Sequence, residues 1–390
     1  MTVVMHSVSR LQKLILAGVL CFGAGVFLAA AQTGAPDSAA AQRALALEQQ
    51  GQWKDAEAAW RQALAANPRD AAASGHLGIV LAREGDYPGA ADAYRRALEL
   101  DPRMTGLQLN LGLALFKQGK LKEAVAPLKA AVAAAPGDAQ PRILLAMSYF
   151  GSAQYAEAIP YLKYAVEQSP QNEELRGVLA QACLYAKQFT CTLEQYKQIV
   201  TANPDSAQAH VLAGEAEDGL HHTPEAIAEF QAAEKVAPHE PNVHFGLGYL
   251  LWTQHKYQDA AQEFKTELKG DPSHLQALAY LGDTEMKLEE TAQAQATLEK
   301  AVALPGATRL AWLDLGIVLA DQGRNDEAET DFKHVIQMDP NQVEGHWRLA
   351  RLYKAEGKTA EAQAEFAKSS ALHEKQDQSL VQQMTPEKQR

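Results

Sequence analysis

A 34-residue pattern, repeated ten times from Asp37 to Glu374 without insertion or deletion, constrains this chain more than any other feature. Prolines mark the period, because they recur at multiples of 34 residues: Pro68, Pro102, Pro136, Pro170, Pro204, Pro238, Pro272 and Pro340. The series is interrupted only at Gly306, which follows Pro305. A fixed period of this length predicts a stack of supersecondary units, which offers a long continuous surface rather than an enclosed active site.

Three positions of the repeat carry side chains of constant size, when each repeat is numbered from 1 to 34 starting at Asp37. Position 8 is always Gly or Ala, and position 20 is Ala except in repeat five, where it is Thr192. Position 24 is always large: Trp60, Tyr94, Leu128, Leu162, Tyr196, Phe230, Phe264, Leu298, Phe332 and Phe366. Small residues at positions 8 and 20 let two antiparallel helices approach closely, and the large residue fills the space beside them.

Each half of the repeat has helical periodicity. Apolar residues recur at i, i+3, i+4 and i+7, as in Leu77, Gly78 and Leu81. A polar turn separates the halves, and in five repeats it is centred on a glycine: Gly51, Gly85, Gly119, Gly323 and Gly357. An Asp-Pro or Asn-Pro pair near the end of five repeats stops the second helix. The sequence therefore predicts two helices in every repeat and no β-strand.

Repeat nine carries the signature residues of a known family at Trp312, Leu315, Gly316, Ala328, Phe332 and Pro340. Through these residues, and through ten in-register repeats over residues 37–374, the chain resembles the tetratricopeptide repeat family. The resemblance implies an all-α fold, a right-handed α-solenoid superhelix of ten helix-turn-helix repeats. Repeat five departs most from the pattern, with Cys183, Thr192 and Ile199 where the family usually has Tyr, Ala and Ala.

The two ends of the chain differ from the repeats. Arg10 and Lys13 precede an apolar run that ends in alanines at Ala31, which predicts a secretory signal peptide over residues 1–31. An uncleaved membrane anchor is the alternative, because about 18 apolar residues can just span a bilayer. Either way we expect residues 32–36 to form a linker and the repeats to lie outside the cytoplasm, in the periplasm or secreted. Residues 375–390 are expected to extend the last helix as a cap and to end in a tail.

The charge balance argues against a nucleic-acid partner. The net charge is −12, and it becomes −14 without residues 1–31, which contain two basic residues and no acidic one. Binding to phosphates needs clustered Lys and Arg. Solvated negative charge that keeps the protein soluble is the simpler interpretation. Beyond the N-terminal segment we expect no membrane contact.

Two cysteines remain after removal of the signal peptide. Cys183 and Cys191 stand on either side of the turn of repeat five. In an oxidising compartment they would form a disulfide across that turn. The alternative is a pair of small buried thiols. The spacing alone does not decide between them, because a disulfide requires Cα atoms about 4.4–6.8 Å apart.

Histidines gather in repeats six and seven: His210, His221, His222, His239, His244, His255 and His274. A metal-dependent activity there is a third-ranked hypothesis, because no pair has the i, i+4 spacing with an adjacent carboxylate that would hold a metal on one helix face. Histidines at helix ends or on the surface are the simpler interpretation. No catalytic motif is found, so we expect no enzyme activity, no metal and no cofactor.

The family resemblance implies a groove, because positions 2, 5, 6, 9, 12 and 13 of each first helix line the concave face in tetratricopeptide repeat proteins. The expected groove residues are Leu109, Leu113, Phe116, Ile143, Met147, Phe150, Tyr185, Phe245, Tyr249, Trp252, Tyr280, Trp347, Arg348, Arg351 and Lys354. An exposed track of apolar and aromatic side chains would be a binding surface. The alternative is that several of them pack between helices as core.

Repeat ten supplies the cations of this set. Arg348, Arg351 and Lys354 lie three residues apart and could hold a carboxylate of a ligand, or they could form a solvated face paired with Asp314 and Asp321. We therefore expect an extracytoplasmic scaffold that binds a protein or peptide segment in the groove, in envelope assembly or secretion. The alternative function is binding of a carbohydrate or envelope polymer on Tyr249, Trp252 and Tyr280.

Overall fold

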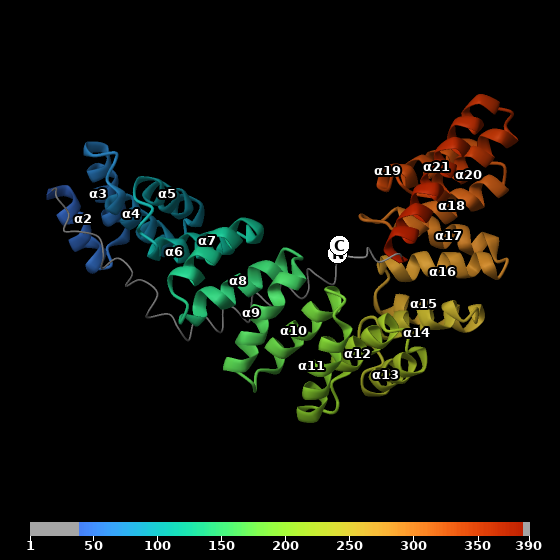
Figure 1. The fold of residues 1–390 in the computed structure, drawn as a ribbon, viewed down its shortest axis with the longest axis horizontal. Coiled ribbons are helices and arrows are strands. Elements are labelled where there is room, and N and C mark those ends of the chain that lie inside the picture. Colours follow the sequence, from blue (N-terminus) through green and yellow to red (C-terminus); the bar gives the residue numbers. More distant parts are fainter. Residues whose placement is uncertain (1–38, 385–390) are drawn as a thin grey trace, which may run out of the picture. The chain divides into compact units, whose positions relative to one another are not determined.

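The computed structural model describes residues 39–384, and no strand occurs among them, which confirms the all-α prediction (Figure 1). The chain divides into two compact units, Met1–Ala202 and Asn203–Arg390. The first unit contains repeats one to five and the second contains repeats six to ten. The expected signal peptide (residues 1–31) and linker (32–36) lie outside the described residues.

The first unit consists of five antiparallel helix pairs, one for each repeat. Its helices are α2 (Ala39–Gln49), α3 (Trp53–Ala66), α4 (Ala71–Glu84), α5 (Tyr87–Leu100), α6 (Gly106–Lys117), α7 (Leu121–Ala134), α8 (Ala139–Gly151), α9 (Tyr155–Gln168), α10 (Glu173–Tyr185) and α11 (Phe189–Ala202).

The second unit repeats this arrangement. Its helices are α12 (Ala207–Gly219), α13 (Thr223–Val236), α14 (Val243–Thr253), α15 (Tyr257–Gly270), α16 (Leu275–Lys287), α17 (Thr291–Val302), α18 (Arg309–Asp321), α19 (Asn325–Met338), α20 (Val343–Ala355) and α21 (Thr359–Met384). The last helix, α21, continues past the end of repeat ten, as the apolar periodicity predicts.

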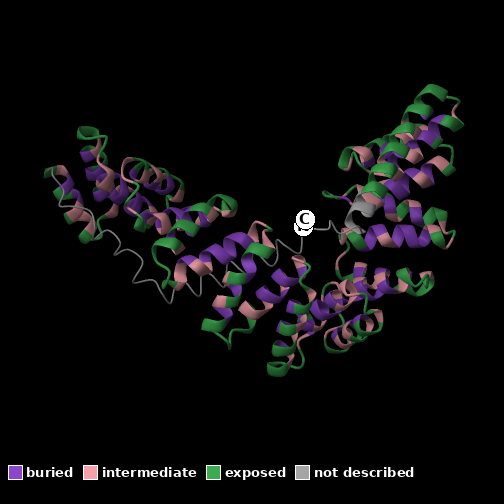
Figure 2. Ribbon diagram, in the orientation of Figure 1, coloured by how far each residue is buried: buried purple, intermediate pink, exposed green. Residues whose placement is uncertain are grey.

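Close approach of the two helices in a repeat depends on the residues at positions 8 and 24. A Cβ atom added to Gly78 would lie 2.6 Å from the ring of Tyr94, and one added to Gly316 would lie 2.7 Å from the ring of Phe332. The position-24 side chains Tyr94, Phe264 and Phe332 are fully buried. Figure 2 shows that buried residues recur along the helices of both units. Each buried side chain of this size contributes roughly 1.5–3 kcal/mol to stability.

First helices of successive repeats lie side by side within each unit. In the first unit α4 contacts α6 and α6 contacts α8, and in the second unit α12, α14, α16, α18 and α20 contact one another in that order. We call the surface formed by these first helices the inner face of each unit. It carries the positions that the sequence assigns to the groove.

The turn between the two helices has the same conformation in all ten repeats. Its position 15 has a positive φ, and in five repeats that residue is the predicted glycine. In repeats four to eight it is Ala153, Lys187, His221, His255 and Glu289, with φ between 58° and 62°. Because a side chain in this conformation costs roughly 1–2 kcal/mol, the central repeats carry local strain that the terminal ones avoid.

Candidate binding face

The predicted groove residues of the first unit are less accessible than expected. Phe116, Met147 and Phe150 belong to the core, and the Phe150 side chain is only 2% exposed. Helical spacing fixes the side of the helix on which a residue lies, but it does not fix how deeply the side chain is buried. These three residues follow the alternative of packing as core, and a role for them in binding stays a prediction.

The other predicted positions of the first unit are Leu109, Leu113, Ile143 and Tyr185, and all four are half-buried. The ring of Tyr185 lies 4.9 Å from the ring of Tyr155, which in turn packs edge-on against Phe150 at 5.4 Å. Among the described residues only Val236 and Met338 are exposed large apolar side chains, and both lie on second helices. The inner face of the first unit therefore offers partly covered apolar side chains, and their role in binding stays a prediction.

The inner face of the second unit carries an aromatic cluster. Phe245, Tyr249 and Trp252 lie on α14, and Tyr280 faces them from α16; all four are half-buried. Tyr280 packs edge-on against both Trp252 and Tyr249, with ring centroids 5.2 Å and 5.3 Å away. Edge-to-face contacts of this kind hold aromatic rings in fixed orientations. The four residues thus form a packed, partly accessible aromatic cluster, and their role in binding stays a prediction.

Asp283 ties this cluster to the next repeat. The Trp252 indole Nε1–H donates to Asp283 Oδ2 at 2.6 Å, although Asp283 itself is only 7% exposed. Lys287 Nζ lies 3.8 Å from the other carboxylate oxygen of Asp283, Oδ1. A buried carboxylate needs such partners, because desolvation disfavours the charged form. Asp283 therefore fixes the orientation of the Trp252 ring at the inner face.

Asp314, on α18, is the next carboxyl along this face, and it has no such partners. It is 4% exposed, and no hydrogen-bond partner is present for its Oδ2 among the described residues. Burial, followed by the charge of Asp283, raises the pKa of Asp314 to about 8, while Lys287 and Arg348 act in the opposite direction. An unsatisfied buried carboxyl costs free energy and requires an explanation.

A second acidic group flanks the aromatic cluster on α12. Burial, with the charge of Asp218 as a smaller cause, raises the pKa of Glu215 to about 7. The charge of Asp218 also adds to the burial that raises the pKa of the Tyr249 phenol. Carboxyl groups therefore lie on both sides of the aromatic cluster, from α12 and from α16 and α18.

The predicted basic residues of α20 surround Trp347. The Arg348 and Arg351 guanidinium carbons lie 5.0 Å and 4.8 Å from the Trp347 ring centroid. Arg348 Nε also donates to Glu344 Oε1 at 2.7 Å, so its ion pair is with Glu344 rather than with Asp314. Arg351 and Lys354 are exposed. The end of the inner face at α20 is therefore basic, whereas its centre is acidic and aromatic.

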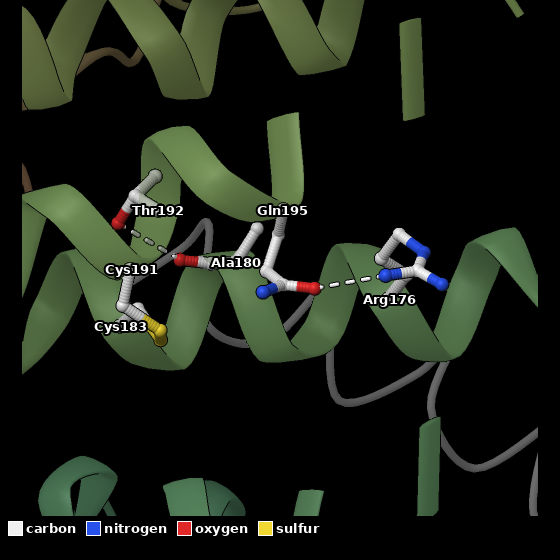
Figure 3. The surroundings of a disulfide bond; sticks show 6 residues. All are labelled: Arg176, Ala180, Cys183, Cys191, Thr192 and Gln195. Carbon is white, nitrogen blue, oxygen red and sulfur yellow. Dashed lines mark hydrogen bonds between the residues drawn. A yellow bond between two sulfur atoms is a disulfide. The ribbon is translucent and has the colours of Figure 1, made fainter. Parts of the chain in front are cut away.

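The two cysteines of repeat five are joined in the structure (Figure 3). Cys183 at the end of α10 and Cys191 at the start of α11 form a disulfide with a Cα–Cα distance of 5.8 Å. Beside it, the Thr192 hydroxyl donates to the Ala180 carbonyl oxygen at 3.4 Å, and Arg176 Nη1 donates to Gln195 Oε1 at 3.0 Å. These contacts connect α10 to α11 in the repeat that departs most from the pattern.

Histidines of the second unit have structural partners that the sequence analysis did not anticipate. His210 and His244 occupy position 4 of their repeats, and each Nδ1 lies 2.7 Å from a glutamate at position 23, Glu229 and Glu263. His346 makes the same contact with its position-23 glutamate. No group of three metal-ligating side chains occurs within residues 39–384. A spacing of 19 residues between His and Glu, repeated in three repeats, was the signal for these pairs.

Comparison with known proteins identifies the repeat. Sequence models described as tetratricopeptide repeats match residues 41–105, 212–274 and 280–343 in one case, and residues 81–147, 149–190 and 319–384 in another. The chain belongs to the tetratricopeptide repeat family. The predicted family and the α-solenoid fold class are thus confirmed.

Among similar proteins, the mouse DnaJ homolog subfamily C member 3 is 29% identical over 128 residues, which are 33% of this chain and 25% of that protein. The CTR9 homolog of Arabidopsis thaliana is 28% identical over 116 residues, 30% of this chain and 11% of that protein. The tetratricopeptide repeat chain thus spans a quarter or less of the length of these relatives.

Similar solved structures include a tetratricopeptide repeat protein from Parabacteroides merdae, at 18% identity and a TM-score of 0.41, covering 70% of this chain and 95% of that chain. Yeast Tom70 is similar at 14% identity and a TM-score of 0.41, covering 90% of this chain and 96% of that chain. These similarities concern the repeat fold alone. Within the described part of this tetratricopeptide repeat protein, no helix combines the length and apolar character needed to cross a bilayer.

Proposed function

We propose that this tetratricopeptide repeat protein is an extracytoplasmic adaptor that binds a segment of a protein partner on the inner face of its second unit. The observation that carries the proposal is the rigid aromatic cluster of Tyr249, Trp252 and Tyr280, which is partly accessible on that face. Aromatic side chains are frequent energetic anchors of protein interfaces, because they bury a large area at low entropic cost.

The charges along the inner face suggest how the bound segment is oriented. Arg351 and Lys354 are exposed on α20, where they attract an acidic part of the bound segment. The carboxyls of α12, α16 and α18 disfavour nucleic acid in the middle of the face, and so does the net charge of −12. The proposal includes no reaction and no cofactor, because the face offers anchors and charges rather than a catalytic constellation.

Two features support a location outside the cytoplasm. Residues 1–31 have the pattern of a signal peptide. The disulfide between Cys183 and Cys191 belongs to an oxidising compartment, because cytoplasmic thiols are kept reduced. A role in envelope assembly or secretion is part of this proposal.

Capture from the native envelope fraction tests the adaptor. The full chain, cross-linked to its neighbours, is compared with a Trp252→Ser/Tyr280→Ser variant whose folding is verified by circular dichroism. The matched control is Val236→Ser/Met338→Ser, which removes two exposed apolar side chains from second helices. We expect one specific protein to be captured by the wild type and the control and to be lost from the inner-face variant.

Other outcomes separate the alternatives. Equal capture by all three proteins would place the binding surface elsewhere. Binding that survives digestion of the envelope fraction with protease would instead identify a carbohydrate or another polymer as the ligand. Absence of any captured protein in every arm would contradict the adaptor function.

A further inference from the structure

Asp314 is an inner-face carboxyl that has one buried oxygen without a hydrogen-bond partner among the described residues. A buried carboxyl oxygen without a donor is rare in native proteins, because leaving it unsatisfied forfeits the hydrogen bonds that water would supply. Asp314 Oδ2 is in this state, and the side chain belongs to position 6 of repeat nine, one of the positions that line the inner face. A hydrogen-bond partner for Asp314 Oδ2 is therefore missing at this point of the face.

The cations nearest to Asp314 do not supply that donor. Arg348 Nε donates to Glu344, its neighbour one turn away on α20. Lys287 Nζ is 3.8 Å from Asp283 Oδ1, at the limit of an ion pair, and its side chain is 50% exposed. Both are long side chains that keep partial exposure to solvent. The site thus has two acidic groups and one loosely held cation.

The aromatic side of the same site suits a cation. Trp252 is oriented by its hydrogen bond to Asp283, and the Tyr280 ring lies 5.2 Å from it. The faces of Trp and Tyr attract ammonium and guanidinium groups, particularly where water is partly excluded. A cation beside both carboxyls also favours their ionised forms, which burial alone disfavours.

We propose that Asp283 and Asp314, together with Trp252 and Tyr280, receive a basic side chain of the bound protein segment, a lysine ammonium or an arginine guanidinium. This inference rests on the proposed adaptor function and specifies the ligand chemistry of its central site. The basic side chain donates to Asp314 Oδ2, displaces Lys287 from Asp283 and lies against the aromatic rings. The acidic part of the same segment lies toward α20.

Three five-residue peptides with blocked termini test this site on the full chain. In each peptide, alanine alternates with one other residue. The other residue is lysine, norleucine or glutamate, so that the side chains of the probes are positive, neutral or negative. The local readout is the Trp252 indole N–H resonance, assigned by Trp252→Phe. The Trp312 indole is the internal reference, because it lies against His334, with ring centroids 4.3 Å apart, and is not part of the cluster. We expect only the lysine peptide to shift the Trp252 resonance.

The matched pair of variants is Asp283→Asn/Asp314→Asn against Asp259→Asn/Asp326→Asn. Both replace two aspartates by asparagines, and Asp259 and Asp326 are exposed on second helices. The inner-face variant is expected to weaken binding of the lysine peptide roughly tenfold or more, as for loss of a charged hydrogen bond. The control pair is expected to leave the affinity within about twofold, since exposed charges contribute little.

The inference is overturned if the norleucine or glutamate peptide binds as tightly as the lysine peptide, or if the two double variants behave alike. It is also overturned if millimolar lysine peptide leaves the Trp252 resonance unchanged. These failures leave the adaptor function intact as long as Trp252→Ser/Tyr280→Ser abolishes capture of the envelope partner. If Trp252→Ser/Tyr280→Ser still captured the envelope partner, the adaptor function itself would be contradicted.

Discussion

The two units are built from the same repeat but bury different polar side chains. In the first unit the buried polar residues are neutral amides, hydroxyls and one imidazole: Ser74, His76, Asn110, Ser148, Thr192 and Gln195. In the second unit five of them are carboxyls: Glu267, Asp283, Glu285, Asp314 and Asp331. Burying a carboxyl is much more costly than burying an amide. The second unit therefore accepts a loss of stability that the fold itself does not require.

The partners of these carboxyls distinguish structural groups from the candidate functional one. Glu267 accepts hydrogen bonds from the backbone N–H groups of Asn242 and Phe245 and so caps the start of α14. Glu285 accepts from the Thr297 hydroxyl at 2.8 Å. Asp314 and Asp331 each keep one oxygen without a partner among the described residues, and only Asp314 belongs to the inner face. The comparison thus singles out Asp314.

The largest expected effect comes from truncating one buried core side chain in either unit. Leu162→Ala in the first unit and Leu298→Ala in the second remove fully buried position-24 side chains. Each is expected to lower the free energy of unfolding by roughly 2–5 kcal/mol. Because contacts in a repeat stack are between neighbours, hydrogen exchange should accelerate mainly in the unit that carries the substitution. Equal acceleration in both units would contradict the comparison.

Replacing Asp314 is expected to stabilise the protein above neutral pH. The pKa of Asp314 is raised from 3.8 to about 8 in the folded state, so the folded chain retains a proton that the unfolded chain has released. Stability from this group is present at low pH and is lost as the pH rises from about 4 to 8. Asp314→Asn should therefore raise the free energy of unfolding at pH 8 by several kcal/mol, because each unit of pKa difference corresponds to about 1.4 kcal/mol.

Urea unfolding between pH 5 and pH 9 measures this effect, and Asp326→Asn is the exposed control. The difference between wild type and Asp314→Asn should grow with pH. A difference that is constant across this range would show that Asp314 is not buried in the way described.

Removing the disulfide should affect the first unit alone. Cys183→Ala/Cys191→Ala releases a short loop, and the loop-entropy argument gives a loss of about 2–3 kcal/mol. Hydrogen exchange of α10 and α11 should increase, while α14 to α20 should be unchanged. The wild type treated with reductant serves as the second test. Unchanged protection of α10 and α11 in both would show that the disulfide does not stabilise repeat five.

The smallest expected effects concern the turns. Gly119→Ala places a side chain in the left-handed conformation of the first unit and should destabilise it by about 1–2 kcal/mol. Glu289→Gly removes such a side chain from the second unit and should stabilise it by up to about 1 kcal/mol, reduced by the greater entropy of glycine in the unfolded chain. Thermal melts measure both, and the same sign for the two changes would refute the strain argument.

Most of the fold could be predicted because the residues that form each packing contact recur in all ten repeats. The pairing of Gly78 with Tyr94, and of Gly316 with Phe332, follows from alternation of small and large residues. The turn between the two helices was predicted where it contains glycine, but its left-handed conformation was not. It could not be predicted at Lys187 or Glu289, because nothing in those residue types indicates a positive φ.

The candidate site was only partly predictable. The family resemblance placed Tyr249, Trp252 and Tyr280 on one face, but it gave no depth. It left open whether Phe150 lines the groove or packs as core, and Phe150 is buried. How deeply a side chain is buried depends on how the adjacent repeats pack against it. For the same reason Asp314 was expected as a solvated partner of the α20 cations, whereas it is buried and Arg348 pairs with Glu344.

The central claim is that binding belongs to the inner face of the second unit. The most direct measurement is quantitative capture of the envelope partner by wild type, by Trp252→Ser/Tyr280→Ser and by the equivalent first-unit variant Leu113→Ser/Tyr185→Ser. The account predicts that the second-unit variant loses the partner and that the first-unit variant retains it. Loss of the partner from the first-unit variant, with full capture by the second-unit variant, would contradict the account.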